Sequence, residues 1–579
     1  MHAMQDRLST VTDTLTAWIQ AAFAALYGET IDVSGVSVVA TGNAAFGDYQ
    51  CNAAMGLAKA LKVPPRAIAE RLVAEAPPHE AVARLEVAGP GFINIFLADA
   101  WLVARVAALR GDTRGGVPLP GQGRTVVMDY SSPNIAKPMH IGHIRSTIIG
   151  NSLDRIYRLL GYRVIADNHI GDWGTQFGII IMGYRHFLDR AALARSPIEE
   201  LERVYVKSYE RAKADEAWMT QCRQELVKLQ AGDPENTALW KQFIALSLGE
   251  FERIYKRLGV AFDLVRGESY YNDRLPGMIG LLVEKGLATE SEGALCVFLE
   301  DDGLPVCIVR KSDGGYNYAT SDLATVFSRV EEFAPERIIY ITDERQQLHF
   351  KQFFTISRKL GVETRLEHVW FGLMRLPDAT FSTRQGNVIK LEHLLDEAER
   401  RAFEMISASS PDMEETRRRE VARAVGIGAV KYADLSQNPQ TTVTFTWDKA
   451  LALDGNSGPY LQYAYARIAS VRDKYQERFP DGDLEAAALV LTEPLERELM
   501  IRLLRFPDVV MRAAENYKPS MVADYLFDLA QTYSSFYQNV PFLKAEPGVR
   551  ESRVLLCGVI ADVLRRGLDL LGIGTPERI

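Results

Sequence analysis

Four residues that suit phosphate chemistry lie within one short segment of the chain, SSPNIAKPMHIGH at residues 131–143. They are Lys137, His140, Gly142 and His143. A lysine supplies a full positive charge, neutral histidines supply hydrogen-bond donors, and a glycine lets a nucleotide approach the backbone closely. This combination predicts a nucleotide-binding segment. The alternative for the two histidines is that they only cap a helix.

The elements around this segment favour the nucleotide interpretation. A continuous β-branched run at 124–130 precedes it, and a helical pattern at 144–160 follows it. In open α/β sheets ligands bind at the carboxyl ends of the strands, and the free N–H groups of a helix N-terminus suit phosphate. The segment resembles the first signature of class I aminoacyl-tRNA synthetases, in the form found in the arginyl-tRNA synthetase family. The resemblance implies that its lysine and histidines stabilise the reacting phosphates.

A second segment, FSTRQGN at 381–387, resembles the arginyl variant of the other class I signature, a loop that stabilises the triphosphate. It departs from the general pattern because Thr383 stands where a catalytic lysine is usual, and Phe381 replaces a methionine. In the family, the lysine just before the first signature takes over that charge, and here this lysine is Lys137. The further ATP contacts that the resemblance implies are Ser382, Thr383 and Arg384.

Selection of arginine requires carboxylates, because a guanidinium group presents five donors and stays charged. The family motif Tyr-x-x-x-Asp occurs as YATSD at 318–322. By resemblance, Tyr318 and Asp322 bind the arginine side chain, and Glu268 joins them. Asp322 could instead be the N-cap of a helix that begins at Leu323, and both roles could coexist.

Three further residues match family positions near the amino acid. Asn134 and Gln346 match positions that hold the α-amino end, and Asp129 matches an acidic position near the substrate. For Asp129, a structural role at the end of a strand is an equal alternative. The motif GDWGTQFG at 171–178 also resembles a family motif, which we assign to the rim of the site without a chemical role. His349 is as well suited to helix packing as to ligand binding.

Three blocks of sequence must position these residues. Residues 1–112 combine helical and strand patterns and predict an α+β domain, which a Gly/Pro-rich linker follows. Residues 120–392 carry the βαβ signals of a doubly wound, Rossmann-type parallel sheet, with a helical insertion at about 190–260. Residues 393–579 have helical spacing throughout. The predicted fold class is therefore α/β, with an additional N-terminal domain and an all-α C-terminal domain.

The resemblance extends to the first block and implies contacts with tRNA there. The segments FGDYQCN at 46–52 and AGPGFIN at 88–94 match the N-terminal additional domain of arginyl enzymes, which touches the outer corner of tRNA. Phe46 and Tyr49 could stack on bases of a single-stranded loop. Packing in a core is an equal alternative for both residues.

The third block carries a corresponding resemblance. The segment GNSGPYLQYAYARI at 455–468 resembles the start of the helical anticodon-binding domain, and we take Tyr460 and Tyr463 within it as tRNA contacts. The family usually ends in methionine, whereas this sequence ends in Ile579. A contact by the terminal side chain is therefore left open.

The composition is that of a folded protein in a reducing compartment. The chain has 579 residues, of which 47% are hydrophobic and 24% charged, and its formal net charge is −9. This negative net charge does not indicate a nucleic-acid partner, although a local groove on an acidic protein can be basic. No apolar run is long enough to predict a membrane span, and the first residues lack a secretory pattern. The five scattered cysteines and the histidines lack metal-ligand spacing, so we expect a cytoplasmic protein with no metal held by the protein itself.

Together the motifs predict an enzyme that joins L-arginine to tRNA(Arg) at the expense of ATP. The resemblance implies an arginyl-adenylate intermediate, release of AMP and pyrophosphate, and Mg²⁺ carried by the substrate phosphates. We expect a monomer. Another class I synthetase, such as a glutaminyl or cysteinyl enzyme, is the main alternative. A small-molecule nucleotidylyltransferase is a weaker one, because such chains are usually much shorter, and the intact signatures argue against a non-catalytic tRNA-binding relative.

Overall fold

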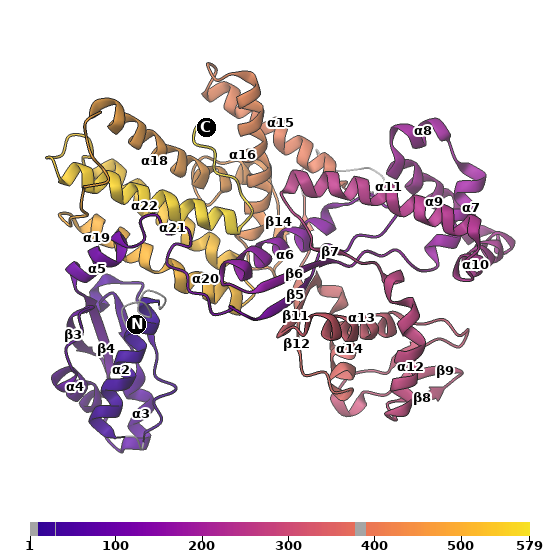
Figure 1. The fold of residues 1–579 in the computed structure, drawn as a ribbon, viewed down its shortest axis with the longest axis horizontal. Helices are drawn as coiled ribbons and strands as arrows, with labels where there is room; N and C mark the ends of the chain where they lie inside the picture. The colour runs from indigo at the N-terminus through magenta and orange to yellow at the C-terminus, as the bar shows by residue number, and fades with distance from the viewer. Residues whose placement is uncertain (1–9, 29–30, 377–388) are drawn as a thin grey trace.

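A five-stranded parallel sheet forms the centre of the protein in a computed structural model that describes residues 10–28, 31–376 and 389–579 (Figure 1). The strands follow the order β12-β11-β5-β6-β7. Their bounds are β5 (Thr125–Asp129), β6 (Arg163–Asn168), β7 (Leu264–Val265), β11 (Arg337–Asp343) and β12 (Arg365–Phe371). The chain builds outward from β5 in both directions, so the strand order reverses between β5 and β11. Ligands bind at such a reversal in doubly wound folds, and the predicted fold class is confirmed.

The β-branched run of β5 is buried because helices cover both faces of the sheet. Val126 and Met128 pack in one core with residues of α6 (Ile141–Leu159), whereas Val127 packs in the other with residues of α13 (Tyr318–Phe333) and α14 (Gln347–Lys359). Successive side chains of a strand point to opposite faces, so both faces of a parallel strand must be apolar. The loop after β5 is thereby held at the edge of a rigid sheet.

Two excursions leave the sheet and return to it. The first is helical and extends to the right in Figure 1. It comprises α7 (Gln176–Phe187), α8 (Arg190–Arg195), α9 (Pro197–Ala214), α10 (Glu216–Gln230) and α11 (Pro234–Leu258). The second contains η3 (Glu268–Arg274), α12 (Leu275–Glu284) and a small antiparallel sheet of β8 (Ala288–Ser291), β9 (Ala294–Val297) and β10 (Cys307–Arg310). The sequence analysis did not predict this small sheet.

The N-terminal region is an antiparallel sheet with helices against it, in the strand order β1-β2-β4-β3. Its elements are α2 (Val11–Tyr27), β1 (Val38–Ala40), η2 (Ala44–Phe46), β2 (Tyr49–Cys51), α3 (Ala53–Leu61), α4 (Pro65–Glu75), β3 (Val82–Ala88), β4 (Phe92–Leu97) and α5 (Asp99–Ala107). It lies below the C-terminal helices in Figure 1. Arg497 joins the two regions, because its guanidinium pairs with Asp48 at 2.8 Å and with Asp99 at 2.7 Å.

The C-terminal region is almost entirely helical. Its elements are α15 (Leu391–Ser409), α16 (Glu415–Leu435), β14 (Val443–Thr444), α17 (Trp447–Ala450), α18 (Gly458–Arg478), α19 (Pro494–Leu504), α20 (Phe506–Glu515), α21 (Ser520–Asn539) and α22 (Val549–Leu570). Arg145 of α6 pairs with Asp434 of α16 at 2.9 Å, and each side chain is only 1% exposed. The same guanidinium donates to the carbonyls of Gly372 and Thr441. A buried charge network therefore fixes the central sheet against the C-terminal helices.

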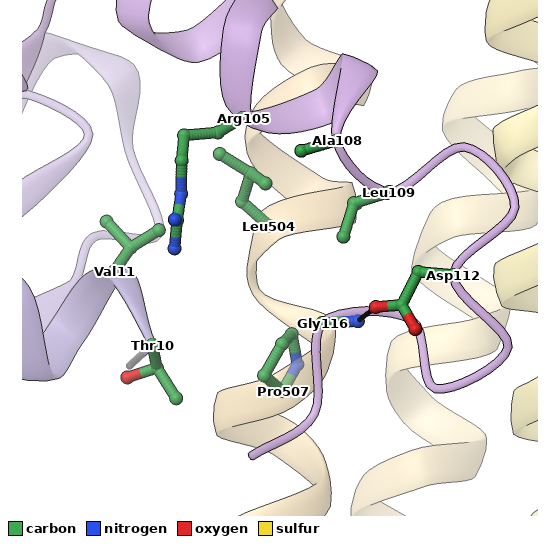
Figure 2. A pocket seen from close by; sticks show the side chains of 9 residues that line it. All are labelled: Thr10, Val11, Arg105, Ala108, Leu109, Asp112, Gly116, Leu504 and Pro507. Carbon is green, nitrogen blue, oxygen red and sulfur yellow. Dashed lines mark hydrogen bonds between the residues drawn. The ribbon is translucent and has the colours of Figure 1, made fainter. Parts of the chain in front are cut away.

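A cavity of about 310 Å³ lies where the N-terminal region meets the C-terminal helices (Figure 2). Arg105 and Leu109 line one side of it, and Leu504 and Pro507 line the other. None of the predicted catalytic residues lines this cavity, so we do not regard it as the candidate site. Within the described ranges, no helix is long and apolar enough to cross a membrane.

Candidate active site

The segment between β5 and α6 has a strained backbone that α11 supports. Ser131, Ser132 and Ala136 have φ values of +73°, +46° and +61°, which residues with a side chain rarely adopt unless their surroundings impose them. The Ser131 hydroxyl lies 2.8 Å from the Tyr255 hydroxyl, and the Ala136 N–H donates to Ser247 Oγ at 2.9 Å. The long helix of the insertion therefore holds the loop that carries the predicted catalytic residues.

His140 and His143 form a reciprocal cap at the start of α6. His140 Nδ1 accepts from the Gly142 N–H, and His143 Nδ1 accepts from the His140 N–H, both at 3.0 Å. Burial lowers the pKa of His143 to about 3, with a smaller effect from His140, and burial also lowers the pKa of His140. Because each neutral ring accepts at Nδ1, its proton is on Nε2. The histidines do cap the helix, and the Nε2–H of each ring is not used by these two capping bonds.

Two cations lie beside the histidines. After burial, Lys137 and Arg345 are the next largest causes of the lowered pKa of His140, so both charges are close to its ring. Arg345 follows β11, pairs with Asp343 at 2.7 Å and keeps 78% of its side chain exposed. Arg345 is not among the residues predicted from the sequence motifs. Its position just after a strand of the sheet could have indicated it, because strand ends meet at the ligand-binding edge.

The described chain that follows the second signature contacts the first signature. The predicted ATP contacts that lie outside the described residues are Ser382, Thr383 and Arg384. The described chain resumes at Ile389, whose carbonyl accepts from the Ile141 N–H at 3.0 Å. The Leu391 N–H then donates to the Met139 carbonyl at 2.9 Å. The chain thus returns to the histidine segment directly after the second signature.

Glu268, Tyr318 and Asp322, which we call the acidic pocket, come together from two elements. Glu268 begins η3, whereas Tyr318 and Asp322 lie one turn apart in α13. The pKa of Glu268 is raised to about 8, mainly by burial and in addition by the charges of Asp322 and Asp172. Within the part of the chain that the structure describes, no lysine or arginine pairs with Glu268 or Asp322. A bound cation would therefore favour the ionised forms of both carboxyl groups.

His349 of α14 orients the Asp322 carboxylate, since its Nε2 lies 2.5 Å from Asp322 Oδ2. The helix α13 begins at Tyr318 with Asn317 as its N-cap, so the alternative that Asp322 caps this helix is wrong. A cavity of about 270 Å³ is lined by Tyr318, His349 and the neighbouring Cys307, among others. His349 combines helix packing with a direct contact to the acidic pocket.

The GDWG motif connects the histidine segment to the acidic pocket. The Asn134 side chain lies over Gly171, where an added Cβ would come within 2.3 Å of Asn134 Oδ1. The next residue, Asp172, accepts from the Ser269 N–H at 2.8 Å and from its hydroxyl at 2.6 Å. Asp172 therefore fixes the turn that presents Glu268. The sequence analysis had given this motif no chemical role.

The two remaining predicted arginine contacts differ in their surroundings. Asp129 is only 5% exposed and accepts from Arg329 at 2.7 Å and from the Ser132 hydroxyl at 3.0 Å. Its carboxylate is thus compensated within the protein, which corresponds to the structural alternative stated for it. Gln346 is exposed at the end of η5 (Glu344–Gln346), next to Arg345.

The predicted tRNA contacts divide by exposure. Phe46 is 50% exposed and Tyr463 is 39% exposed, with the Arg467 guanidinium 4.9 Å from the Tyr463 ring centre. Tyr460 is partly buried, and its hydroxyl lies 3.2 Å from that of Ser534. The prediction that Tyr49 stacks on a base is wrong, because Tyr49 is fully buried in the N-terminal core. Its β-strand position alternates inward, and a buried ring cannot reach a nucleotide.

Comparison with known protein families shows which family this chain matches. Residues 107–447 match the family "tRNA synthetases class I (R), catalytic domain", 461–579 match the DALR anticodon binding domain, and 13–97 match the arginyl tRNA synthetase N terminal domain. The sheet and its two signatures thus define a class I aminoacyl-tRNA synthetase.

Relatives specify the family further. The arginine–tRNA ligase of Fusobacterium nucleatum is 48% identical over 543 residues, which cover 94% of this chain and 95% of that protein. The arginine–tRNA ligase of Azotobacter vinelandii is 43% identical, over 98% of this chain and all of that protein. The chain belongs to the arginyl-tRNA synthetase family. The crystal structure of arginyl-tRNA synthetase from Plasmodium falciparum superposes with a TM-score of 0.83 at 27% identity, covering 99% of this chain and all of that chain.

Proposed function

We propose that this protein joins L-arginine to tRNA(Arg) in two steps that consume ATP. In the first, the arginine carboxylate attacks the α-phosphorus of ATP, the bond to the bridging oxygen breaks, and pyrophosphate leaves. In the second, a ribose hydroxyl of the terminal adenosine of tRNA attacks the carbonyl carbon of the arginyl-adenylate, and AMP leaves. The curated relatives carry the name of this activity.

The observation that carries the arginine assignment is an acidic pocket that has no lysine or arginine partner. The charge of Asp322 adds to burial in raising the pKa of Glu268, and among the described residues only His349 forms a pair with Asp322. A guanidinium is permanently charged and can donate to both carboxylates at once, whereas a glutamine or cysteine side chain brings no positive charge to balance them. Cationic arginine is therefore the amino acid that suits this pocket.

The chemistry of activation requires mostly positioning and charge stabilisation. We assign the Nε2 donors of His140 and His143, together with the charge of Lys137, to the phosphate oxygens that gain negative charge. Gly142 and the residues Ser382, Thr383 and Arg384 complete the proposed ATP site. Asn134 and Gln346 hold the α-amino end of arginine, and Asp129 supports the loop from behind through Ser132.

In the proposed reaction, Mg²⁺ binds to the protein together with the nucleotide, on its phosphate oxygens. Mg²⁺ keeps most of its waters and binds one or two protein carboxylates plus substrate phosphates, so it needs no dedicated protein cage. Within the described ranges, no group of three or more His, Cys, Asp or Glu side chains has the geometry of a metal site. The protein residues near the phosphates are donors and cations, which suit the anion and leave the metal to the phosphate oxygens.

The three blocks divide the work. Residues 120–392 activate arginine, residues 1–112 contact the outer corner of the tRNA through Phe46, and residues 393–579 bind the anticodon through Tyr460 and Tyr463. The match of residues 461–579 to the DALR anticodon binding domain supports the last assignment. The protein acts as a monomer in the cytoplasm.

The experiment that tests this function is arginine-dependent exchange of pyrophosphate into ATP, measured with the intact protein in the presence of tRNA(Arg). Exchange with arginine and none with lysine, glutamine or cysteine is the expected result. Formation of arginyl-tRNA, detected by acid gel or by labelled arginine, checks the second step. Exchange with another amino acid would refute the arginine assignment.

A further inference from the structure

The helical insertion contributes a side chain to the catalytic lysine. Lys137 Nζ lies 5.0 Å from the centre of the Tyr205 ring, which comes from α9. We propose that Tyr205 is a positioning residue for adenylate formation, which seats the Lys137 ammonium beside the phosphates through a cation–π contact. This inference rests on the proposed function.

An aromatic ring suits this task better than a carboxylate does. A ring face attracts an ammonium group within about 6 Å, and this attraction leaves the positive charge in place. A carboxylate would neutralise the charge that the phosphates require. Among the residues that the structure describes, Lys137 forms no ion pair, although Glu202 lies one turn from Tyr205 on the same helix. Burial raises the pKa of Glu202, while Lys390 and Lys137 lower it.

The ring itself is held in place by the insertion. Tyr205 packs against the apolar cluster of Ile179, Met182, Ala212, Trp218 and Cys222. It also lies nearly parallel to the Tyr209 ring, with ring centres 5.9 Å apart and planes inclined by 9°. A ring fixed on two sides leaves its remaining surface for the ammonium group.

The helix that carries Tyr205 is also tied to the histidine segment. Lys390 pairs with Glu199 of α9 at 2.7 Å, and Lys390 forms a backbone bridge with His140. The ring, the histidines and the chain that leaves the second signature are therefore connected at one place. Movement of α9 would displace the lysine relative to His140.

The expected consequence concerns the rate of activation rather than substrate affinity. A lysine side chain has four rotatable bonds and loses considerable rotamer freedom when it is ordered. Without the ring, the ammonium group would still be present but would occupy the productive position less often. The turnover rate should fall while the KM values for arginine and ATP remain nearly unchanged.

The test compares ring-removing and ring-keeping variants in the pyrophosphate exchange assay. Tyr205→Leu should lower the exchange kcat about tenfold, the size expected for losing a partly desolvated cation–π contact, whereas Tyr205→Phe should stay within about twofold of wild type. Phe187→Leu is the matched control. Phe187 packs against the same cluster, and the cation over its ring is Lys207 at 4.6 Å rather than Lys137, so this variant should also stay near wild type.

A double-mutant cycle with Lys137→Ala tests whether Tyr205 acts through the lysine. In the Lys137→Ala background, Tyr205→Leu should have no further effect on the exchange rate. Thermal melting of each variant verifies the fold, and Tyr205→Met replaces Tyr205→Leu if the leucine variant melts early.

Three outcomes would overturn the inference. An unchanged kcat in the folded Tyr205→Leu or Tyr205→Met variant would do so, and so would an equal loss in Tyr205→Phe, or an undiminished effect when Lys137 is already alanine. If the wild-type protein itself fails to exchange pyrophosphate with arginine and tRNA(Arg), the proposed function and the role of Tyr205 both fall. If the wild type is active and the Tyr205 variants have the same kcat as the wild type, only the proposed role of Tyr205 is refuted.

Discussion

At the scale of single residues, the acidic pocket that we propose for arginine holds a proton on Glu268 at neutral pH. The pKa of Glu268 is about 8, mainly because the carboxyl is buried and secondly because Asp322 is close. At pH 7 the empty pocket therefore holds a mostly protonated Glu268. A guanidinium favours the ionised form, so binding should release the proton.

This linkage predicts how arginine affinity depends on pH. As pH rises from 6 towards 8, the proton is lost more easily, and the KM for arginine should fall by up to about tenfold per pH unit before it levels off above pH 8. Calorimetry of arginine binding at pH 7 in two buffers of different ionisation enthalpy should detect release of about one proton. The Glu268→Gln variant has no proton to release, so its weaker binding should depend little on pH. A wild-type KM that is flat over this range would contradict the prediction.

Asp322→Asn should weaken arginine binding strongly. The change removes one charge from a desolvated pair while keeping an oxygen that accepts from His349, so the expected loss is about 2–5 kcal/mol. This corresponds to a KM for arginine raised about thirtyfold or more. Asp302→Asn, which removes a carboxylate paired with Lys359 on the surface, is the control and should leave KM unchanged. A KM for Asp322→Asn within twofold of wild type would exclude the contact.

The residue predictions succeeded where a motif fixed both identity and place. The clustering of Glu268, Tyr318 and Asp322 was anticipated from such motifs, although their assigned roles stay predictions. Tyr49 failed because strand alternation, not residue type, decides whether an aromatic ring is exposed. Arg345 was missed because its charge becomes significant only when β11 brings it beside the histidines.

At the scale of elements, α11 connects the insertion to the loop after β5. Ser247 is fully buried and gives the Ala136 N–H its acceptor, and Tyr255 contacts Ser131. A loop with three left-handed residues would otherwise relax to a lower-energy backbone. The helical insertion is thus part of the catalytic scaffold.

Ser247→Ala should therefore impair both stability and activation. It leaves a buried N–H without an acceptor, which costs about 1–3 kcal/mol, and should lower the melting temperature and the rate of pyrophosphate exchange together. Ser357→Ala is a matched control, because Ser357 is equally buried in a helix and its hydroxyl likewise donates to the carbonyl four residues earlier. The control should melt close to wild type and keep its activity. Full activity in Ser247→Ala would show that the loop after β5 does not depend on the hydrogen bond to Ser247.

Elements were predictable where their periodicity was strong. The sequence patterns at 124–130 and 144–160 agree with β5 and α6 to within a few residues, because a short β-branched run favours a buried strand and a long helical pattern favours a helix. The small β8-β9-β10 sheet was not predicted, since its four-residue strands are too short for an alternation to stand out. The start of α13 was misjudged because Asn317, not Asp322, caps it.

At the scale of the whole molecule, the Arg497 side chain connects the N-terminal region to the C-terminal helices. Arg497 of α19 pairs with Asp48 and Asp99, and it donates to the Leu97 carbonyl at 3.1 Å. The Asp48 side chain is only 6% exposed at this contact. The placement of the N-terminal region relative to a bound tRNA therefore depends on this junction.

Arg497→Ala should loosen the N-terminal region without touching the catalytic site. Loss of the partner of a buried carboxylate should weaken the junction by about 1–3 kcal/mol, raise the KM for tRNA and speed proteolytic cleavage in the linker. Exchange activity at saturating tRNA should stay near wild type. Arg502→Ala on the same helix removes a pair with Glu498 that does not cross the junction, and it should change none of these quantities. Equal tRNA KM values for the two variants would show that the junction is unimportant for tRNA.

The buried pair of Arg145 and Asp434 limits how this protein can be dissected or recombined. Arg145 belongs to α6, at whose start the two proposed catalytic histidines lie, and Asp434 belongs to α16, far along the chain. A fragment that ends before α16, or a chimera with an unrelated C-terminal half, would leave the Arg145 guanidinium in the interior without its carboxylate partner. Although the regions form separate blocks in the sequence, any exchange of a region between proteins must replace both partners of this ion pair together.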